Sequence, residues 1–425
     1  MKNHHRGIVV GVLLLTLVLS GCSTPWDTAR SGSRDRAYIV YWPPADSGKT
    51  RVAVKDLIDM KGVVTTAGSE FLAKSSPPAA RDAACLRLAR NRNVQFVGKT
   101  NLSELAVGVS GINDYFGTPK NRVNPKRKLI PGGSSSGSAV ALVDGTADIA
   151  IGTDTAGSIR VPAACCGIVG LKTTFGLVPL DGVYPIAPTS LDTVGPMAKD
   201  VAHTVQGMDL LQEGFASRYA SAAAAKPLAK MIKVGRLYLS GTNAKVDRAV
   251  DDALSKAGFK VVALGKDFQA KWNQAEKDAK TVAAASVWLS DQKFKNERGI
   301  TTRTKVIVAL GALDYPTNYR AALKRQAEWQ ATLRRVFQKV DFIALPTLQT
   351  LPPTIPFFGG TVAFEALVLS AQNTAAVNFA GNPALAMPIP VEDKTVAVTS
   401  LQLIGPRLSE AALLNAGRLV EARRR

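Results

Sequence analysis

The chain alternates between two patterns of hydrophobic and polar positions. Short apolar runs rich in β-branched and aromatic residues predict strands. The strand-like runs lie at 37–42, 52–54, 94–98, 148–151 and 341–346. The helix-like segments lie at 82–92, 139–143, 269–293 and 317–339. Because the two kinds of segment alternate from residue 52 onward, the pattern predicts an α/β fold with a central sheet.

No internal repeat and no clear boundary divides the chain between residues 51 and 425, so we expect one domain there. Residues 22–50 are rich in Ser, Asp, Arg, Pro and Gly, a composition typical of a tether and N-terminal segment that leads into the domain. The short alanine run at 221–225 is expected to be a surface link.

The N-terminus has the pattern of an export signal. Lys2 and Arg6 precede an apolar run at 8–19, which is shorter than the ~20 residues that a membrane span needs. The run ends in Leu-Ser-Gly before Cys22, which resembles a bacterial lipoprotein box. The resemblance implies that residues 1–21 are a signal peptide and that the Cys22 thiol carries a lipid, which anchors the protein to a membrane. An ordinary secretory signal with an incidental cysteine is the alternative.

The residue after the predicted lipidation site refines the expected location. An Asp directly after the lipidated cysteine would resemble the inner-membrane retention signal, but this chain has Ser23 there. We therefore expect a cell-envelope protein. If the organism has an outer membrane, we expect the protein to lie on it, facing the periplasm.

Composition and charge narrow the function classes. Hydrophobic residues make up 46% of the chain and charged residues 20%, which allows a full core and excludes general disorder. The 53 Lys and Arg residues exceed the 33 Asp and Glu residues, giving a net charge of +20. The basic residues are dispersed and lack interleaved aromatic residues, and the chain is predicted to be exported, so we expect no nucleic-acid partner. A surface near anionic lipid or polysaccharide fits better.

Cysteine and histidine usage excludes several kinds of site. Beyond Cys22 the chain has Cys85, Cys165 and Cys166, which we expect to be buried thiols, although a disulfide from Cys85 to one of the others is possible. Beyond the N-terminus the only histidine is His203, on the expected polar face of a helix. A Ser-His-Asp triad and a metal site are therefore not expected.

Two loops of small residues are the candidates for chemistry. GGSSSGS at 132–138 and GTDTAGS at 152–158 combine glycines with hydroxyl side chains. The second loop is predicted to open a helix at Ser158, so its backbone N–H groups could point at a developing oxyanion. With no histidine available, a lysine of lowered pKa could act as the base. Lys55, at the end of an apolar strand, is a candidate for partial burial.

These loops resemble the amidase signature family, which hydrolyses amides with a Ser-Ser-Lys triad. The resemblance extends over most of the chain in ordered blocks. Besides the two loops, the matching blocks lie at 54–69, 96–108, 116–125, 162–179, 190–201, 378–390 and 400–406. The resemblance implies the amidase-signature fold, a mixed central sheet of about eleven strands wrapped by α-helices, and makes residues 51–425 an amidase domain.

The resemblance also assigns roles to individual residues. It implies that Ser158 is the nucleophile, that Ser134 is the bridging serine preceded by a cis peptide, and that Lys55 is the base. It places the oxyanion hole on the backbone of Thr155, Ala156, Gly157 and Ser158. The mechanism requires neither a metal nor a cofactor.

The neighbouring polar residues are expected to be structural. Asp154 and Arg160 would brace the loop rather than react, and Asp192 would do the same. Ala156 and Ser136 stand where the family usually has glycine. If the backbone at Ala156 had a positive φ, alanine there would cost about 1 kcal/mol.

The sequence thus predicts a lipid-anchored amidase that converts a small amide or peptide amide to an acid and ammonia or an amine. A tRNA-dependent amidotransferase component belongs to the same family, but predicted export disfavours that function. The alternative from another class is a non-catalytic envelope-binding lipoprotein that retains the fold. Covalent labelling of Ser158 would separate the two. The sequence does not fix the oligomeric state.

Overall fold

The computed structural model describes residues 36–357 and 360–423. The predicted signal peptide, Cys22 and the first part of the predicted tether, up to residue 35, lie outside these residues. Within them, eleven strands form one sheet. The strands are β1 (Tyr38–Tyr41), β2 (Thr50–Lys55), β3 (Val94–Thr100), β4 (Ile149–Asp154), β5 (Val169–Lys172), β6 (Thr193–Ala198), β7 (Lys233–Arg236), β8 (Lys260–Ala263), β9 (Phe342–Pro346), β10 (Ala384–Pro390) and β11 (Val398–Ile404).

The sheet has the order β1-β3-β2-β4-β6-β5-β10-β11-β9-β7-β8. β2 pairs in parallel with β3 and β4, and β7 pairs in parallel with β8 and β9. The remaining six pairings are antiparallel. The mixed sheet of eleven strands confirms the predicted fold class.

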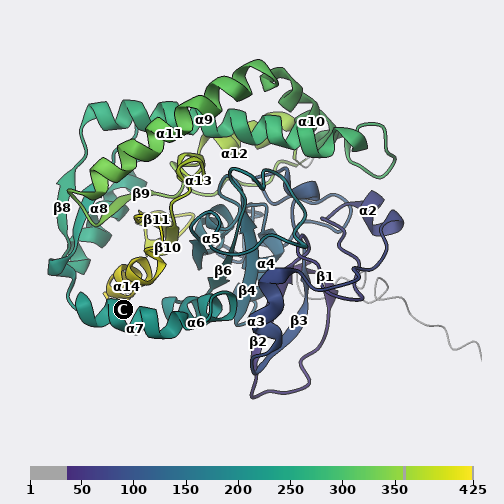
Figure 1. Cartoon of the computed structure of the whole chain (residues 1–425), viewed down its shortest axis with the longest axis horizontal. Coiled ribbons are helices and arrows are strands. Elements are labelled where there is room, and N and C mark those ends of the chain that lie inside the picture. The colour runs from purple at the N-terminus through teal and green to yellow at the C-terminus, as the bar shows by residue number, and fades with distance from the viewer. Residues whose placement is uncertain (1–35, 358–359, 424–425) are drawn as a thin grey trace, which may run out of the picture.

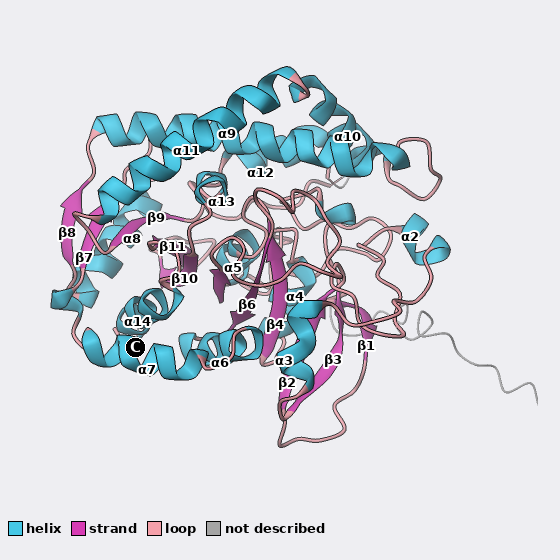
Figure 2. Ribbon diagram, in the orientation of Figure 1, coloured by secondary structure: helices cyan, strands magenta, loops and turns pink. Residues whose placement is uncertain are grey.

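Thirteen α-helices of the described residues surround the sheet. They are α2 (Glu70–Ser75), α3 (Arg87–Arg90), α4 (Ser136–Val143), α5 (Arg160–Cys166), α6 (Val201–Leu211), α7 (Phe215–Ala225), α8 (Ala244–Ala257), α9 (Lys266–Asp291), α10 (Thr302–Asp314), α11 (Thr317–Phe337), α12 (Val362–Ser370), α13 (Ala375–Ala380) and α14 (Glu410–Glu421). Figure 1 shows α9, α10 and α11 along one side of the molecule and α6, α7 and α14 along the opposite side. The strands run between these layers (Figure 2).

Alternation along β2 positions the first candidate residue. Val52 and Val54 belong to the main hydrophobic core with α6, α8 and α14, whereas Ala53 packs on the other face with α4 and α5. Because side chains alternate along a strand, Lys55 lies on the same face as Ala53. This face carries α4, which begins just after the first small-residue loop.

Two local predictions are corrected by the structure. The alanine run 221–225 is the last part of α7, not a link, which agrees with the high helix propensity of alanine. The segment 82–92 contains only a 3-10 turn at Ala84–Leu86 and the four-residue α3. The pattern did not predict α10 at all. No helix of the described residues combines the length and the apolarity needed to cross a membrane.

Candidate active site

Lys55 ends β2 inside the protein. Its side chain is fully buried, and its Nζ donates hydrogen bonds to Ser134 Oγ at 2.7 Å and to Thr153 Oγ1 at 2.8 Å. Burial lowers the pKa of Lys55 to about 7, although the nearby charges of Asp154 and Asp192 oppose this shift. A neutral amine is therefore accessible near neutral pH, with its nitrogen next to a serine hydroxyl.

The first small-residue loop holds Ser134 against Lys55. The Gly133–Ser134 peptide is cis. The Ser134 carbonyl accepts a hydrogen bond from Ser103 N at 3.2 Å, and Gly133 N donates to Val109 O at 2.8 Å. The loop 132–135 is thus held by the segment 103–111 on one side and by α4, which starts at Ser136, on the other.

Ser158 lies beside this loop. Ser135 N donates to the Ser158 carbonyl at 3.2 Å, which joins the two small-residue loops. Ser158 is 8% exposed, and its hydroxyl has no hydrogen-bond partner within the described residues. The structure brings Lys55 and Ser134 into direct contact and places Ser158 on the adjoining turn. Among the described residues there is no direct hydrogen bond between the hydroxyls of Ser134 and Ser158.

The predicted start of the following helix is corrected. The helix α5 begins at Arg160, not at Ser158. The carboxylate of Asp154 accepts hydrogen bonds from Gly157 N at 2.8 Å and from Ile159 N at 3.1 Å. These contacts hold the residues around Ser158 in a turn that precedes the helix.

The turn also limits which amides can face an oxyanion. Among the predicted oxyanion donors, Gly157 N already donates a hydrogen bond to Asp154 Oδ1 in this structure. The amides of Thr155, Ala156 and Ser158 have no partner in the part of the chain that the structure describes, and they remain available. Glycine is required at 157, where φ is +134° and a Cβ would collide with the side chain of Thr374. Ala156 is absent from the positive-φ residues of the described chain, so the cost considered for alanine does not arise.

Asp154 and Arg160 form the brace that the sequence predicted. Both side chains are fully buried, and Arg160 Nε and Nη2 contact the Asp154 carboxylate at 3.1 and 2.9 Å. Burial alone would raise the pKa of Asp154, but the charge and hydrogen bonds of Arg160 outweigh it and hold that pKa well below its ordinary value. Arg160 also donates to Thr374 O and Gln402 Oε1, which connects the turn to α13 and β11.

Replacing Arg160 with methionine should therefore destabilise the protein by about 3–5 kcal/mol, because it leaves the Asp154 carboxylate buried without its cation. Urea denaturation followed by circular dichroism measures the change. The matched control is Arg92→Met, because the Arg92–Asp209 pair is partly exposed, with 3.5 Å between its charged atoms. The control should cost less than about 1 kcal/mol. Equal effects of the two substitutions would contradict the brace.

Asp192 was predicted to be structural, and it supports the same turn. Its carboxylate accepts hydrogen bonds from Thr155 Oγ1 at 2.6 Å and from the amides of Ile186 and Ala187 at 2.9 Å each. Burial raises the pKa of Asp192 above its ordinary value, although these hydrogen bonds and the charge of Lys55 oppose the shift. The carboxylate therefore links the turn at 155–158 to the segment 186–192.

Sequence reasoning missed two residues of this region. Thr153 accepts the second hydrogen bond of Lys55, and its only sequence signal is its position at the end of β4, beside the signature turn. The buried Glu365 on α12 accepts hydrogen bonds from Val109 N and Ser110 N at 3.0 and 3.1 Å. The signal for Glu365 is that it is the only charged residue in the apolar stretch of α12.

His203 and the three described cysteines lie where the sequence predicted them. His203 lies on α6, its side chain is 44% exposed, and its Nδ1 contacts Asp200 Oδ1 at 2.7 Å. Cys85, Cys165 and Cys166 are buried free thiols. Burial raises the pKa of Cys85 and of Cys165 to about 12, so they are not nucleophiles near neutral pH. No cluster of three His, Cys, Asp or Glu residues suited to a metal is found among the described residues.

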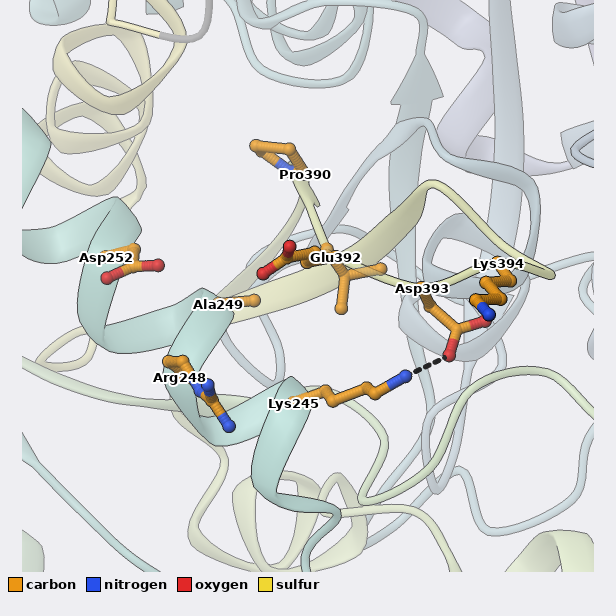
Figure 3. Close-up of a pocket in the computed structure, with 9 residues that line it drawn as sticks. Lys245, Arg248, Ala249, Asp252, Pro390, Glu392, Asp393 and Lys394 are labelled. Carbon is orange, nitrogen blue, oxygen red and sulfur yellow. Dashed lines mark hydrogen bonds and ion pairs between the residues drawn. The ribbon is translucent and has the colours of Figure 1, made fainter.

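A surface cavity of about 570 Å³ lies away from this chemistry. It is bounded by α8 and by the segment 390–394 between β10 and β11, and none of the predicted site residues lines it (Figure 3). Lys245 Nζ pairs with Asp393 Oδ2 across one end at 2.9 Å. Acidic and basic side chains alternate around the cavity, so it presents no single charge to a ligand.

The fold and the relatives of this chain define a hydrolase of carbon–nitrogen bonds. The chain belongs to the amidase family, because the family model described as Amidase matches residues 51–414. The match begins within β2, covers β3 to β11 and includes both small-residue loops.

Two curated relatives are similar over most of their length. A glutamyl-tRNA(Gln) amidotransferase component from Halobacterium salinarum is 32% identical, over 88% of this chain and 95% of its own. The 2-amino-5-chloromuconic acid deaminase of Comamonas testosteroni is 33% identical, over 87% of this chain and 80% of its own. The crystal structure of a glutamyl-tRNA(Gln) amidotransferase component from Thermotoga maritima superposes with a TM-score of 0.75 at 25% identity, covering 92% of this chain and 88% of that one.

Proposed function

We propose that this protein hydrolyses a small carboxylic amide through an acyl-enzyme on Ser158, with Ser134 and Lys55 as the other members of a Ser-Ser-Lys triad. The observation that carries the proposal is the buried hydrogen bond from Lys55 Nζ to Ser134 Oγ, together with the lowered pKa of Lys55. A neutral lysine can accept a proton from a neighbouring hydroxyl, and an ordinary surface lysine cannot do so efficiently at pH 7.

The proposed steps move one proton along the three residues. Lys55 accepts the proton of Ser134, Ser134 accepts that of Ser158, and Ser158 Oγ bonds to the amide carbon. The free amides of the turn, at Thr155, Ala156 and Ser158, stabilise the oxyanion. The C–N bond then breaks as the proton returns to the leaving nitrogen. Water attacks the acyl carbon, gives up a proton through the same residues, and releases the acid and a free Ser158.

Release of ammonia or amine from a panel of small amides and C-terminally amidated peptides tests this function. The mature protein should turn over at least one member of the panel without any added protein or tRNA. A well-folded protein that neither turns over the panel nor becomes covalently labelled at Ser158 would contradict the proposal and favour a non-catalytic binding role.

The relatives support a second candidate function. Several are named as components of glutamyl-tRNA(Gln) amidotransferase, so a role as the amide-hydrolysing member of a complex is the alternative to an independent enzyme. The predicted export signal favours the independent enzyme, because aminoacyl-tRNA is a cytoplasmic substrate. Hydrolysis that appears only after partner proteins are added would favour the role within a complex.

We further propose that the protein is exported, anchored through a lipid on Cys22 and located on the outer membrane, facing the periplasm. The support is the sequence pattern at 2–22 alone. Mass spectrometry of the N-terminal peptide from membrane fractions should find a diacylglyceryl group on Cys22, and Cys22→Ser should abolish it. An unmodified Cys22 at the mature N-terminus would contradict the anchor. A mature N-terminus at any other residue would contradict it as well.

A further inference from the structure

The outward face of α10 carries no charged residue. Its exposed positions recur every three or four residues, which places them on one side of the helix. These positions are Thr302, Val306, Ala309, Leu310 and Leu313. The solvent face of a helix in a globular protein usually carries charged and polar residues. Leu313 is 77% exposed and Leu310 is 47% exposed, so this face departs from the usual pattern.

The neighbouring helix α12 also has an uncharged exposed side. Figure 1 shows α12 beside α10, and Arg303 Nη1 donates to Gly360 O at 3.1 Å, which ties the start of one helix to the start of the other. The exposed positions of α12 are Ala363, Ala366, Leu367 and Ser370. None is charged, and Leu367 is 59% exposed. We name these nine exposed positions the α10–α12 face.

The inner sides of both helices already contact other parts of the protein. Gly311 on α10 lies so close to Ala284 and Trp288 of α9 that a Cβ there would collide with them. Glu365, the single acid of α12, points inward to the segment 109–110. The apolar residues of the α10–α12 face are therefore additional to the core. Exposed apolar residues that gather on neighbouring helices are a feature of interaction sites.

Basic residues flank this face. The segment 293–314 contains five Lys and Arg residues and two acids. Lys293, Lys295 and Arg298 are exposed just before α10 begins. An apolar helix face bordered by basic side chains matches the boundary of an anionic bilayer, where acyl chains meet negatively charged headgroups.

The start of the described chain and the inner side of α10 contribute to one hydrophobic cluster. Ile39 and Val40 of β1 share a hydrophobic cluster with Ile300 and with Val308 on the inner side of α10. Thirteen residues separate Cys22 from Arg36, and the 14 residue steps from one to the other reach at most about 50 Å. A lipid on Cys22 would therefore hold Arg36 within that distance of the membrane, a step that depends on the proposed anchor.

We propose that the α10–α12 face rests on the surface of an anionic lipid bilayer. The apolar residues enter the boundary between headgroups and acyl chains, and the basic segment 293–298 contacts the phosphates. The lipid anchor and this face then hold the enzyme at the membrane together, because two weak attachments give a stable one.

A fluorescent probe tests this contact on the full-length chain. The described cysteines are buried, so an environment-sensitive maleimide should label Leu310→Cys selectively, with any reaction at Cys22 measured on the parent protein and subtracted. The control is Leu228→Cys, because Leu228 is 52% exposed and lies outside the face, before β7. Vesicles of phosphatidylglycerol and phosphatidylethanolamine should raise the fluorescence of the label at 310 by about threefold or more, with a blue shift, and leave the label at 228 unchanged.

Every other outcome overturns the docking proposal. An unresponsive label at 310, or equal responses at 310 and 228, would show that this face does not enter the bilayer. A blue shift of the label at 310 without vesicles, growing with protein concentration, would assign the face to a second copy of the chain. A blue shift without vesicles that does not depend on protein concentration would assign the face to the chain's own N-terminal residues. The mass of the Cys22 peptide, measured on the same preparation, reports separately whether the anchor is present.

Discussion

Replacing Ser158 with alanine should reduce turnover by about 10⁴-fold or more and leave the fold intact. The substitution removes the oxygen that would bond to the acyl carbon, and without it the other triad members have nothing to activate. The Ser158 hydroxyl has no hydrogen-bond partner within the described residues, so its loss leaves no buried group unpaired. The free energy of unfolding should change by less than about 1 kcal/mol. Release of ammonia or amine, together with urea denaturation, measures both effects.

Ser136→Ala is the matched control for this substitution. Ser136 begins α4, two residues after Ser134, and its buried hydroxyl also lacks a partner among the described residues. The control should keep turnover within about threefold of the parent. Undiminished hydrolysis by the Ser158→Ala protein, or an equally large loss in the control, would contradict the role of Ser158.

Local sequence was sufficient to predict the role of residues whose partners are close in the chain. Asp154 and Arg160 are six residues apart in one signature block, and their bracing role was predicted and is found. The burial of Lys55 was predicted only as partial. The structure buries it fully, because α4 and the loop before it cover the face of β2 that carries Ala53 and Lys55.

Contacts between distant segments could not be predicted from the pattern. Glu365 meets Ser110 across 255 residues of sequence, and Thr153 meets Lys55 across 98. The turn at Ser158 was predicted to be the first turn of a helix, because glycine and serine positions do not reveal that Asp154 uses the amides of Gly157 and Ile159.

Several helices were not predicted, and two of them, α7 and α10, show different physical reasons. The outward side of α10 is as apolar as its inward side, so the chain shows no amphipathic period there. The alanine run of α7 is low in complexity but high in helix propensity, and its partly buried side packs against α14. The apolar exterior that concealed α10 in the sequence is also the feature that makes it a candidate membrane surface.

The rate of hydrolysis should rise with pH through about 7 and then level off. Lys55 is active as the neutral amine, and burial lowers its pKa to about 7. Below that pH the neutral fraction falls tenfold per unit, so kcat/KM for an amide without ionisable groups should fall in proportion. If the base were an ordinary lysine with a pKa of about 10.4, the rate of hydrolysis would still be rising at pH 9. Lys55→Met should reduce kcat by about 10²–10⁴-fold.

Two further variants assign this titration to Lys55. The Asp192 charge raises the pKa of Lys55, so Asp192→Asn should shift the midpoint of the kcat/KM profile to lower pH. Lys172 is a second fully buried lysine whose pKa burial lowers to about 7, but its Nζ donates to the carbonyls of Thr173 and Asn382. Lys172→Met should therefore leave the midpoint unchanged. A profile that moves with Lys172 and not with Asp192 would refute Lys55 as the base, because the titrating amine would then be one that contacts no serine.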